Sequence, residues 1–350
     1  MNKLEFLLER NHYVKDIMDE SFAISNSIDR WKQTDQFSII AEKVNLFPYS
    51  KIILTGMGSS FYALYPLYCG LIQHNIPVFH IEASELLNYS SELISDDCLT
   101  IMVSQSGESI EIQKLLNNRK RRGLTIAITN TQASTLHTLS DCSFLTDAGI
   151  EKSVSCKTYL SALAAITILG DILLKDDLVN TVNALQCAAQ KIEKYLSNIE
   201  DHVNQLVDLL SETKYLMITG RGPSISSAYT SSLIIKEAAH FFAEGMNSAA
   251  FRHGPYEIIL SDLFLVTFSG NKNVRELNKR LVDDVNSDGG KAVLVKQGKA
   301  CDPFVIPEVP DSILPIVEML PAQMLSIALS ILHEHEPGEF GLISKITLAE

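Results

Sequence analysis

The sequence is short of the features that mark nucleic-acid-binding, secreted or membrane proteins. Lys and Arg number 29 against 42 Asp and Glu, a formal net charge of −13, whereas proteins that bind phosphate backbones concentrate basic residues on one surface. No sustained apolar run reaches the roughly 18 residues that span a bilayer. The first ten residues are polar and charged, unlike a signal peptide. We therefore predict a cytoplasmic protein with no nucleic-acid or membrane partner.

Cysteine and metal-binding patterns are equally scarce. None of the six cysteines forms a C-x-x-C pair, and their spacing matches no zinc site, so we interpret them as reduced thiols. No cluster of His, Asp and Glu has the spacing of metal ligands. We predict neither a metal nor a cofactor. The negative charge does not exclude a small anionic ligand, because backbone amides can create a local anion site.

What the sequence does contain is a repeated alternation of short apolar runs with helix-like stretches. The runs predict strands at Lys51–Gly56, Val78–Ile81, Leu99–Val103, Leu124–Thr129, Lys214–Gly220, Leu263–Thr267 and Gly290–Val295. Such alternation is typical of parallel β-α-β units with right-handed crossovers. The longer run Tyr159–Leu174 is interrupted by Thr, Ser, Gly and Asp and predicts a buried helix.

The two halves of the chain resemble each other. Aligning Thr55-Gly56 with Thr219-Gly220 also brings Ser106-Gly107 within one residue of Ser269-Gly270, and two matches at nearly one offset favour a duplication. We predict an α/β fold with two doubly wound, flavodoxin-like parallel sheets in tandem. Two unrelated doubly wound domains are the alternative.

The 350 residues suffice for two domains. We predict a helical segment over residues 1–30, a first α/β domain over 31–190 and a second over 191–350. Between the halves, Leu178–Leu210 has helical periodicity and contains neither Pro nor Gly, which predicts a pair of connecting helices rather than a flexible linker.

Two turns in the first half combine glycine with hydroxyl side chains. Thr55–Ser60 reads TGMGSS, in which Gly58, Ser59 and Ser60 could approach an anion at a helix start. A plain turn is equally consistent. The dinucleotide-binding fingerprint is absent, because Phe61 stands where its third glycine belongs.

The second turn is the stronger candidate for a phosphate site. The run LTIMV leads into Ser104–Ser109, which reads SQSGES and precedes a helix expected near Ile110. In open α/β sheets, ligands bind at this carboxyl end of the strands. Helix capping alone would explain one serine, but not three serines and a glutamine. The predicted phosphate ligands are Ser104, Gln105, Ser106 and Ser109.

The second half holds a candidate acid–base pair. Glu237 lies in the apolar helical segment SSLIIKEAAHFF, and His253 precedes Gly254-Pro255 sixteen residues later. A surface Lys–Glu pair and a structural histidine are the alternatives when each is taken alone. Aldose–ketose interconversion needs a carboxylate beside C1 and C2 and a group that moves a proton to the ring oxygen, and histidine suits the second task near neutral pH.

These motifs together resemble the double sugar-isomerase (SIS) domain family of phosphosugar enzymes. SQSGES is similar to the family's SQSGET phosphate loop, and Glu237 and His253 have the spacing of its K-E and K-H-G-P motifs. Lys15–Glu20 (KDIMDE), Leu320–Leu325 (LPAQML) and the terminus KITLAE are also similar to family segments. The resemblance covers nearly the whole chain. It is strongest to the isomerase half of glucosamine-6-phosphate synthase, with sugar-phosphate deaminases and fructosamine-6-phosphate deglycases as relatives.

The resemblance implies roles for individual residues. Glu237 would move the proton between the two carbons, and His253 would open the sugar ring from the partner subunit of a homodimer. Lys345 would condense with the ketose carbonyl, and Val154 and Cys156 would line the sugar. Cys156 stands where the family has a hydroxyl, and Ile234 where the synthase has a lysine, so the exact substrate is open.

The sequence therefore predicts a metal-independent phosphosugar isomerase, deaminase or deglycase. Its substrate would be a 6-phosphorylated amino sugar or a fructosamine-type adduct, and no glutaminase domain is expected. A non-catalytic sugar-phosphate sensor is the alternative from another class, although the retained Glu237 and His253 favour an enzyme. A nucleotide-binding α/β protein is disfavoured by the missing glycine pattern.

Overall fold

The computed structural model describes residues 3–118, 123–260 and 262–342. Contacts divide the chain into two compact units, each built around one five-stranded sheet. The first-sheet unit comprises Phe22–Ile150 and Lys157–Gln186. The second-sheet unit comprises the described residues up to Ser21, Glu151–Cys156, and the described residues from Cys187 onward. Each unit is thus assembled from more than one stretch of the chain.

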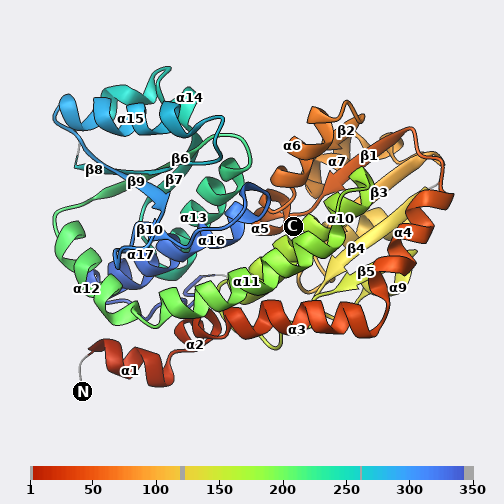
Figure 1. Ribbon diagram of the computed structural model, residues 1–350, viewed down its shortest axis with the longest axis horizontal. Coiled ribbons are helices and arrows are strands. Elements are labelled where there is room, and N and C mark those ends of the chain that lie inside the picture. The colour runs from red at the N-terminus through yellow and green to blue at the C-terminus, as the bar shows by residue number, and fades with distance from the viewer. Residues whose placement is uncertain (1–2, 119–122, 261, 343–350) are drawn as a thin grey trace. The chain divides into compact units, whose positions relative to one another are not determined.

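The first sheet contains five parallel strands, β1 (Lys51–Thr55), β2 (Val78–His80), β3 (Cys98–Val103), β4 (Leu124–Thr129) and β5 (Cys142–Leu145). Their order is β2-β1-β3-β4-β5 (Figure 1). The register pairs Thr55 with Met102 and Val103 with Ile128, so the carboxyl ends of β1, β3 and β4 share one edge. Every residue of β3 and β4 is buried, as expected of parallel strands covered on both faces.

Helices cover both faces of this sheet. One group contacts α10 (Lys157–Leu174) and comprises α4 (Gln36–Leu46), α5 (Gly58–Tyr62) and α6 (Tyr65–Gln73). The opposite group packs its apolar side chains with those of Ile53, Met102 and Ala127. Its members are α7 (Ala83–Tyr89), η1 (Ser91–Leu93), α8 (Ile110–Asn118) and α9 (Thr135–Leu139). This two-sided cover is the doubly wound arrangement that the sequence predicts.

The second sheet is also parallel throughout. Its order is β10-β9-β8-β6-β7, from β6 (Tyr215–Gly220), β7 (Ala243–Asn247), β8 (Leu263–Phe268), β9 (Lys291–Gln297) and β10 (Val305–Ile306). On one face α13 (Ser224–Ala239) packs with α16 (Leu314–Val317) and α17 (Met319–Leu332), and α17 packs with α12 (Ile199–Leu210). The other face carries α14 (Ser248–Phe251), η2 (Pro255–Ile258) and α15 (Arg275–Ser287).

The remaining helices precede or connect these elements. They are α1 (Lys3–Arg10), α2 (His12–Met18), α3 (Glu20–Gln33), α11 (Leu178–Leu196) and the short η3 (Asp311–Ile313). Together α11 and α12 confirm the predicted pair of connecting helices.

The two sheets have the same topology, which confirms the predicted tandem fold. Counted along the chain, each sheet has the strand order 2-1-3-4-5. Backbone conformation repeats as well: Gly58 and Gly222 have φ of 51° and 56°, and Gly107 and Gly270 have φ of 66° and 70°. These positive values occupy matching turns after the first and third strand of each sheet, where glycine avoids the strain that other residues would meet.

Two described segments, Lys157–Leu174 and Asp311–Leu332, have the length and apolar composition of membrane-crossing helices. Within their apolar windows, however, 72% and 94% of the residues are buried. Helices that are apolar on all sides serve as core helices when packed between other layers. The first of them confirms the buried helix predicted at Tyr159–Leu174.

Candidate functional site

The predicted phosphate residues lie at the carboxyl edge of the first sheet. Ser59 and Ser60 are in α5, directly after β1, and the loop Ser104–Ser109 joins β3 to α8. β1 and β3 are neighbours in the sheet, and a Cβ atom on Gly56 would lie 2.9 Å from the Val103 carbonyl oxygen. The structure therefore brings both turns to the position where doubly wound folds bind ligands.

Hydrogen bonds within the loop hold its serines in place. The Oγ atom of Ser104 accepts from the Gly107 amide at 3.2 Å and lies 3.4 Å from Ser109 Oγ. The Ser106 hydroxyl oxygen accepts from the Glu108 amide at 3.2 Å. Ser104 is buried, whereas Gln105, Ser106 and Ser109 are half-buried. Half-buried hydroxyls at the start of α8 suit an incoming anion.

Gly107 fixes the shape of this loop. Its φ is 66°, and a Cβ atom there would lie 2.3 Å from Ser134 Oγ. Its carbonyl accepts from the Leu136 amide at 3.1 Å. Only glycine satisfies both the positive φ and the contact with α9.

Glu108 braces the loop from outside, a role that the sequence did not reveal. One carboxylate oxygen accepts from the Thr135 amide at 2.6 Å, and the other accepts from the Thr135 hydroxyl at 2.9 Å and from Gln113 at 2.5 Å. Both oxygens are thus engaged by α8 and α9. These hydrogen bonds fix the Glu108 carboxylate, which is the one carboxylate of the loop. It is therefore not free to approach an anion and repel it.

Glu237 occupies the last turn of α13 in the second-sheet unit. Its side chain is half-buried, whereas the preceding Lys236 is exposed. Ile234, one turn earlier, is 1% exposed, so the position where the synthase has a lysine is filled by a core residue. The helical environment predicted for Glu237 is confirmed, and its catalytic role stays a prediction.

A buried tyrosine connects Glu237 to a set of polar groups in the same unit. Tyr13 is fully buried, and its hydroxyl lies 3.0 Å from Ser326 Oγ. Burial raises the pKa of Tyr13 well above its usual value, and the nearby Cys156, Glu20 and Glu237 raise it further. All three groups therefore act electrostatically on the same buried hydroxyl.

The segment predicted to line the sugar is itself buried. Val154 and Cys156 are 1% and 0% exposed. The Cys156 amide donates to Glu151 Oε1 at 2.9 Å, and its thiol donates to the same oxygen at 3.5 Å. Glu151 is thereby fixed by the segment that it precedes. That Val154 and Cys156 line the sugar stays a prediction.

Glu20 and Gln323 form a second buried contact in this unit. Gln323 Nε2 donates to Glu20 Oε1, and both residues are 0% exposed. Burial raises the pKa of Glu20 well above its usual value, which favours the neutral acid. Among the described residues, Glu20 Oε2 and Gln323 Oε1 find no hydrogen-bond partner. The sequence pointed to both segments by resemblance but assigned neither residue a role.

His253 lies in a tight turn and faces solvent. It follows α14, its amide donates to the Ala250 carbonyl at 2.9 Å, and its side chain is exposed. The next residue, Gly254, has φ of 128°, a conformation that favours glycine. Arg252 is paired with Asp284 at 2.6 Å. Lys345 lies outside the described residues.

The model of one protein family matches residues 45–170, and its description is the SIS domain. This range contains the first sheet, both serine turns and the Glu108 brace. Residues 45–170 thus match the SIS domain model.

Relatives and solved structures extend the similarity beyond this SIS domain. A glutamine–fructose-6-phosphate aminotransferase (isomerizing) of Pyrococcus horikoshii is 28% identical over 96% of this chain, which spans 57% of that protein. The C-terminal domain of glucosamine-fructose-6-phosphate aminotransferase from Francisella tularensis superposes with a TM-score of 0.79 at 22% identity, covering 94% of this chain and 98% of that one. Glucosamine-6-phosphate deaminase from Thermotoga maritima gives 0.74 at 18% identity, covering 96% and 99%. The chain thus has the fold of phosphosugar isomerase and deaminase domains.

The carboxyl edge of the second sheet also carries serines at a helix start, but there a side chain of the protein itself, Glu318, contacts them. After β6, at the position that matches the Gly58–Ser60 turn after β1, Ser224 and Ser227 at the start of α13 donate to the two carboxylate oxygens of Glu318, at 2.7 and 2.5 Å. Glu318 is 1% exposed, and burial raises its pKa to about 7. Serine hydroxyls at this helix start thus donate to a carboxyl group, and that group belongs to the protein itself.

Proposed function

We propose that this chain is a phosphosugar isomerase, deaminase or deglycase acting on a 6-phosphorylated amino sugar or a fructosamine-type adduct. The observation that carries the proposal is the Ser104–Ser109 loop, held rigid at the carboxyl edge of the SIS sheet. A phosphate would accept hydrogen bonds from Ser104, Ser106 and Ser109, with Ser59 and Ser60 from the adjacent turn. The names of similar proteins, an isomerizing aminotransferase and a deaminase, support this substrate class.

The proposed chemistry is enolisation of an open-chain sugar. Glu237 would take the proton from one of the two carbons C1 and C2 and return it to the other, which requires a positioned carboxylate and no redox change. His253 would transfer a proton to the ring oxygen and open the sugar. Its exposure is consistent with service to a partner subunit, and we propose a homodimer on this basis.

Two departures bear on the choice of substrate. Ile234 supplies no charge beside Glu237, and Cys156 offers a thiol already engaged by Glu151. The residues that remain suit the proton transfer shared by isomerases, deaminases and deglycases. Lys345 would condense with a carbonyl in the first of these reactions. We also place the protein in the cytoplasm, where sugar phosphates are produced, without a nucleic-acid or membrane partner.

A substrate panel in deuterated water tests the proposal. Purified protein would receive fructose 6-phosphate, glucosamine 6-phosphate and a 6-phosphorylated fructosamine–amino acid, with ammonia, free amino acid and sugar isomers measured separately. We expect release or isomerisation with one of them, together with solvent deuterium at C1 or C2. Binding of a sugar phosphate with no exchange on any compound would contradict an enzyme and support a sensor.

The phosphate assignment predicts a loss of affinity on removal of either hydroxyl. Ser106→Ala and Ser104→Ala should each weaken sugar-phosphate binding by about 1–2 kcal/mol, the scale of a hydrogen bond to a charged group. Calorimetry with fructose 6-phosphate measures this, and binding of unphosphorylated fructose should not change. Ser211→Ala, an exposed serine after α12, is the control. Wild-type affinity in both loop variants would show that the phosphate binds elsewhere.

A further inference from the structure

A cavity of about 500 Å³ lies within the second-sheet unit. It is formed by side chains of α11 and α12 together with the segment that leads from β9 to β10. Its volume falls in the range of small-molecule sites. None of the residues assigned above to phosphate binding or proton transfer lines it.

The charge of this cavity is opposite to that of the chain. Lys191, Lys194 and Lys299 line it against one carboxylate, that of Glu308, in a protein with a formal net charge of −13. The Lys191 ammonium donates to the Glu308 carbonyl at 2.5 Å, which holds it at the wall. A local excess of positive charge raises the concentration of small anions at such a site.

A thiol and an imidazole meet in the same cavity. Cys301 Sγ lies 3.7 Å from His202 Nε2. The thiol is exposed, whereas His202 is 2% exposed. Burial lowers the pKa of His202, although Asp302 and Asp201 oppose this shift, so the imidazole is neutral near pH 7. A neutral imidazole beside a thiol is the arrangement that activates sulfur nucleophiles.

Packing holds this pair in place. The Tyr195 ring packs against His202 with centroids 4.4 Å apart, and the Tyr195 hydroxyl donates to the Pro303 carbonyl at 2.7 Å. The loop that carries Cys301 is thereby tied to the helices that carry His202. His202 Nδ1 is buried and finds no hydrogen-bond partner in the described part of the chain, so no described group prevents the tautomer in which Nε2 accepts a proton.

We propose that the cavity is a modification site, at which Cys301 undergoes exchange with a small anionic disulfide of the glutathione type. The thiol proton passes to His202 Nε2, and the thiolate attacks one sulfur of the disulfide. A bond forms between Cys301 and that sulfur as the reagent's own S–S bond breaks. The departing thiolate takes the proton from the imidazolium. The cysteine sulfur is oxidised and the released sulfur is reduced, so no other oxidant is required.

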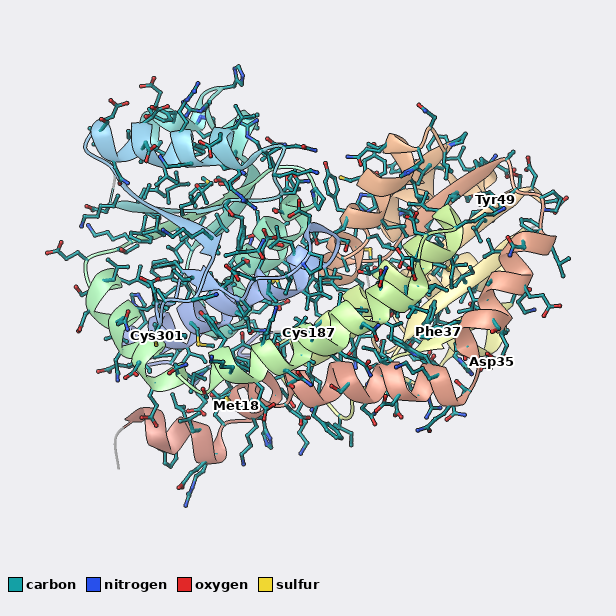
Figure 2. All side chains as sticks on the ribbon, viewed as in Figure 1. Met18, Asp35, Phe37, Tyr49, Cys187 and Cys301 are labelled. Atoms are coloured by element: carbon teal, nitrogen blue, oxygen red, sulfur yellow. The ribbon has the colours of Figure 1, made fainter. Side chains whose placement is uncertain are left out.

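The chain contains its own reference thiol. Among its six cysteines only Cys187 and Cys301 are exposed, and Figure 2 shows Cys187 on α11 and Cys301 in the loop between β9 and β10. Cys187 does not line the cavity. Cys69 and Cys142 are unreactive by comparison, because burial raises the pKa of their thiols to about 11 and about 12.

The test compares two disulfides of opposite charge on the full-length protein. Glutathione disulfide is anionic and cystamine is dicationic, and peptide mass spectrometry gives the rate at each cysteine. With glutathione disulfide we expect Cys301 to react at least about tenfold faster than Cys187, the lower end of electrostatic steering. With cystamine this preference should shrink. Cys301→Ser should abolish the fast phase, and Cys187→Ser should leave it intact.

Further variants separate the effect of the lysine charges from the effect of His202 as the base. Lys194→Gln with Lys299→Gln should slow the glutathione disulfide reaction about tenfold and spare the cystamine reaction. The control Lys32→Gln with Lys43→Gln makes the same charge change on α3 and α4 and should alter neither. His202→Asn should slow both reagents. Equal reaction rates at Cys301 and Cys187 with both disulfides would overturn the proposal. So would a preference of glutathione disulfide for Cys301 that survives replacement of the two lysines. Neither measurement depends on sugar-phosphate turnover.

Discussion

Replacing Glu237 with glutamine is expected to lower turnover of the panel substrate by roughly 10²–10⁴, the usual contribution of a positioned acid–base group, with substrate affinity nearly unchanged. Glutamine keeps the size and hydrogen-bonding capacity of glutamate but cannot take a proton from carbon. Glu237 is half-buried at the end of α13 and lies near the buried Tyr13, so the amide should be accommodated without repacking the core. Solvent deuterium exchange at C1 or C2 should fall by the same factor as turnover.

Glu244→Gln is the matched control for this measurement. Glu244 is an exposed carboxylate on β7 of the same unit, and its replacement should leave turnover at the wild-type level. If Glu237→Gln turns over at the wild-type rate while the fold is intact, another residue moves the proton.

Mixing experiments extend the same prediction to His253. In the proposed homodimer, each site takes Glu237 from one subunit and His253 from its partner. A hybrid dimer of one Glu237→Gln subunit and one His253→Ala subunit therefore has one site with both native residues and one site with neither. Half of the randomly mixed dimers are hybrids, so activity should recover to about one quarter of wild type. No recovery would mean that His253 serves its own subunit or that the protein is not a dimer.

Replacing Glu318 with glutamine is expected to stabilise the protein at neutral and alkaline pH. Burial raises the pKa of this carboxyl from its ordinary 4.5 to about 7, so the folded state binds its proton more tightly than the unfolded state. The associated stability is fully present below pH 4.5 and is lost as the pH rises through about 7. A difference of this size corresponds to about 3 kcal/mol, which the glutamine variant does not lose.

Urea unfolding between pH 4.5 and pH 8 measures this effect. The stability of the variant relative to wild type should rise across this range by up to about 3 kcal/mol and then level off. Glu20, whose pKa is also raised by burial, is present in both proteins and cancels in the comparison. Glu257→Gln, an exposed carboxylate, should track wild type. A relative stability that is flat with pH would show that Glu318 is buried as a carboxylate at no net cost.

The central strands and the edge strand β2 were predictable from sequence, whereas the edge strands β5, β7 and β10 were not. β3, β4 and β8 are buried at every residue and read as continuous apolar runs, which is the signature of a parallel strand covered on both faces. β7 has the sequence AEGMN, and β10 has two residues. Edge strands pair on one side only, so their side chains are under weaker selection for apolar, branched residues. The domain boundaries at residues 30 and 190 stay a prediction.

The candidate site, too, was only partly predictable from the sequence. The serine loop was predictable because its polar residues lie close together in the sequence and follow a recognisable strand. Glu20 and Gln323 were not assigned roles because they are distant in sequence: Gln323 meets Glu20 across 303 positions. Glu108 was missed because its contact with Thr135 joins residues 27 positions apart. A local motif carries no information about such contacts, which depend on the packing of helices from both ends of the chain.

The carboxyl group of Glu318 contacts its serine partners as a bound ligand would, but it is covalently part of the protein. Because Glu318 is part of the chain, it is held beside Ser224 and Ser227 at a high effective concentration, and an anion in solution would have to compete with it for these hydroxyls. If the first-sheet loop binds a sugar phosphate as proposed, only that repeat responds to the substrate concentration, because in the other repeat Glu318 already contacts the serines. Duplication of a fold therefore need not double the number of ligands bound: under the proposed function one sheet edge binds a substrate, and at the other a carboxyl group of the protein itself takes the place of a ligand.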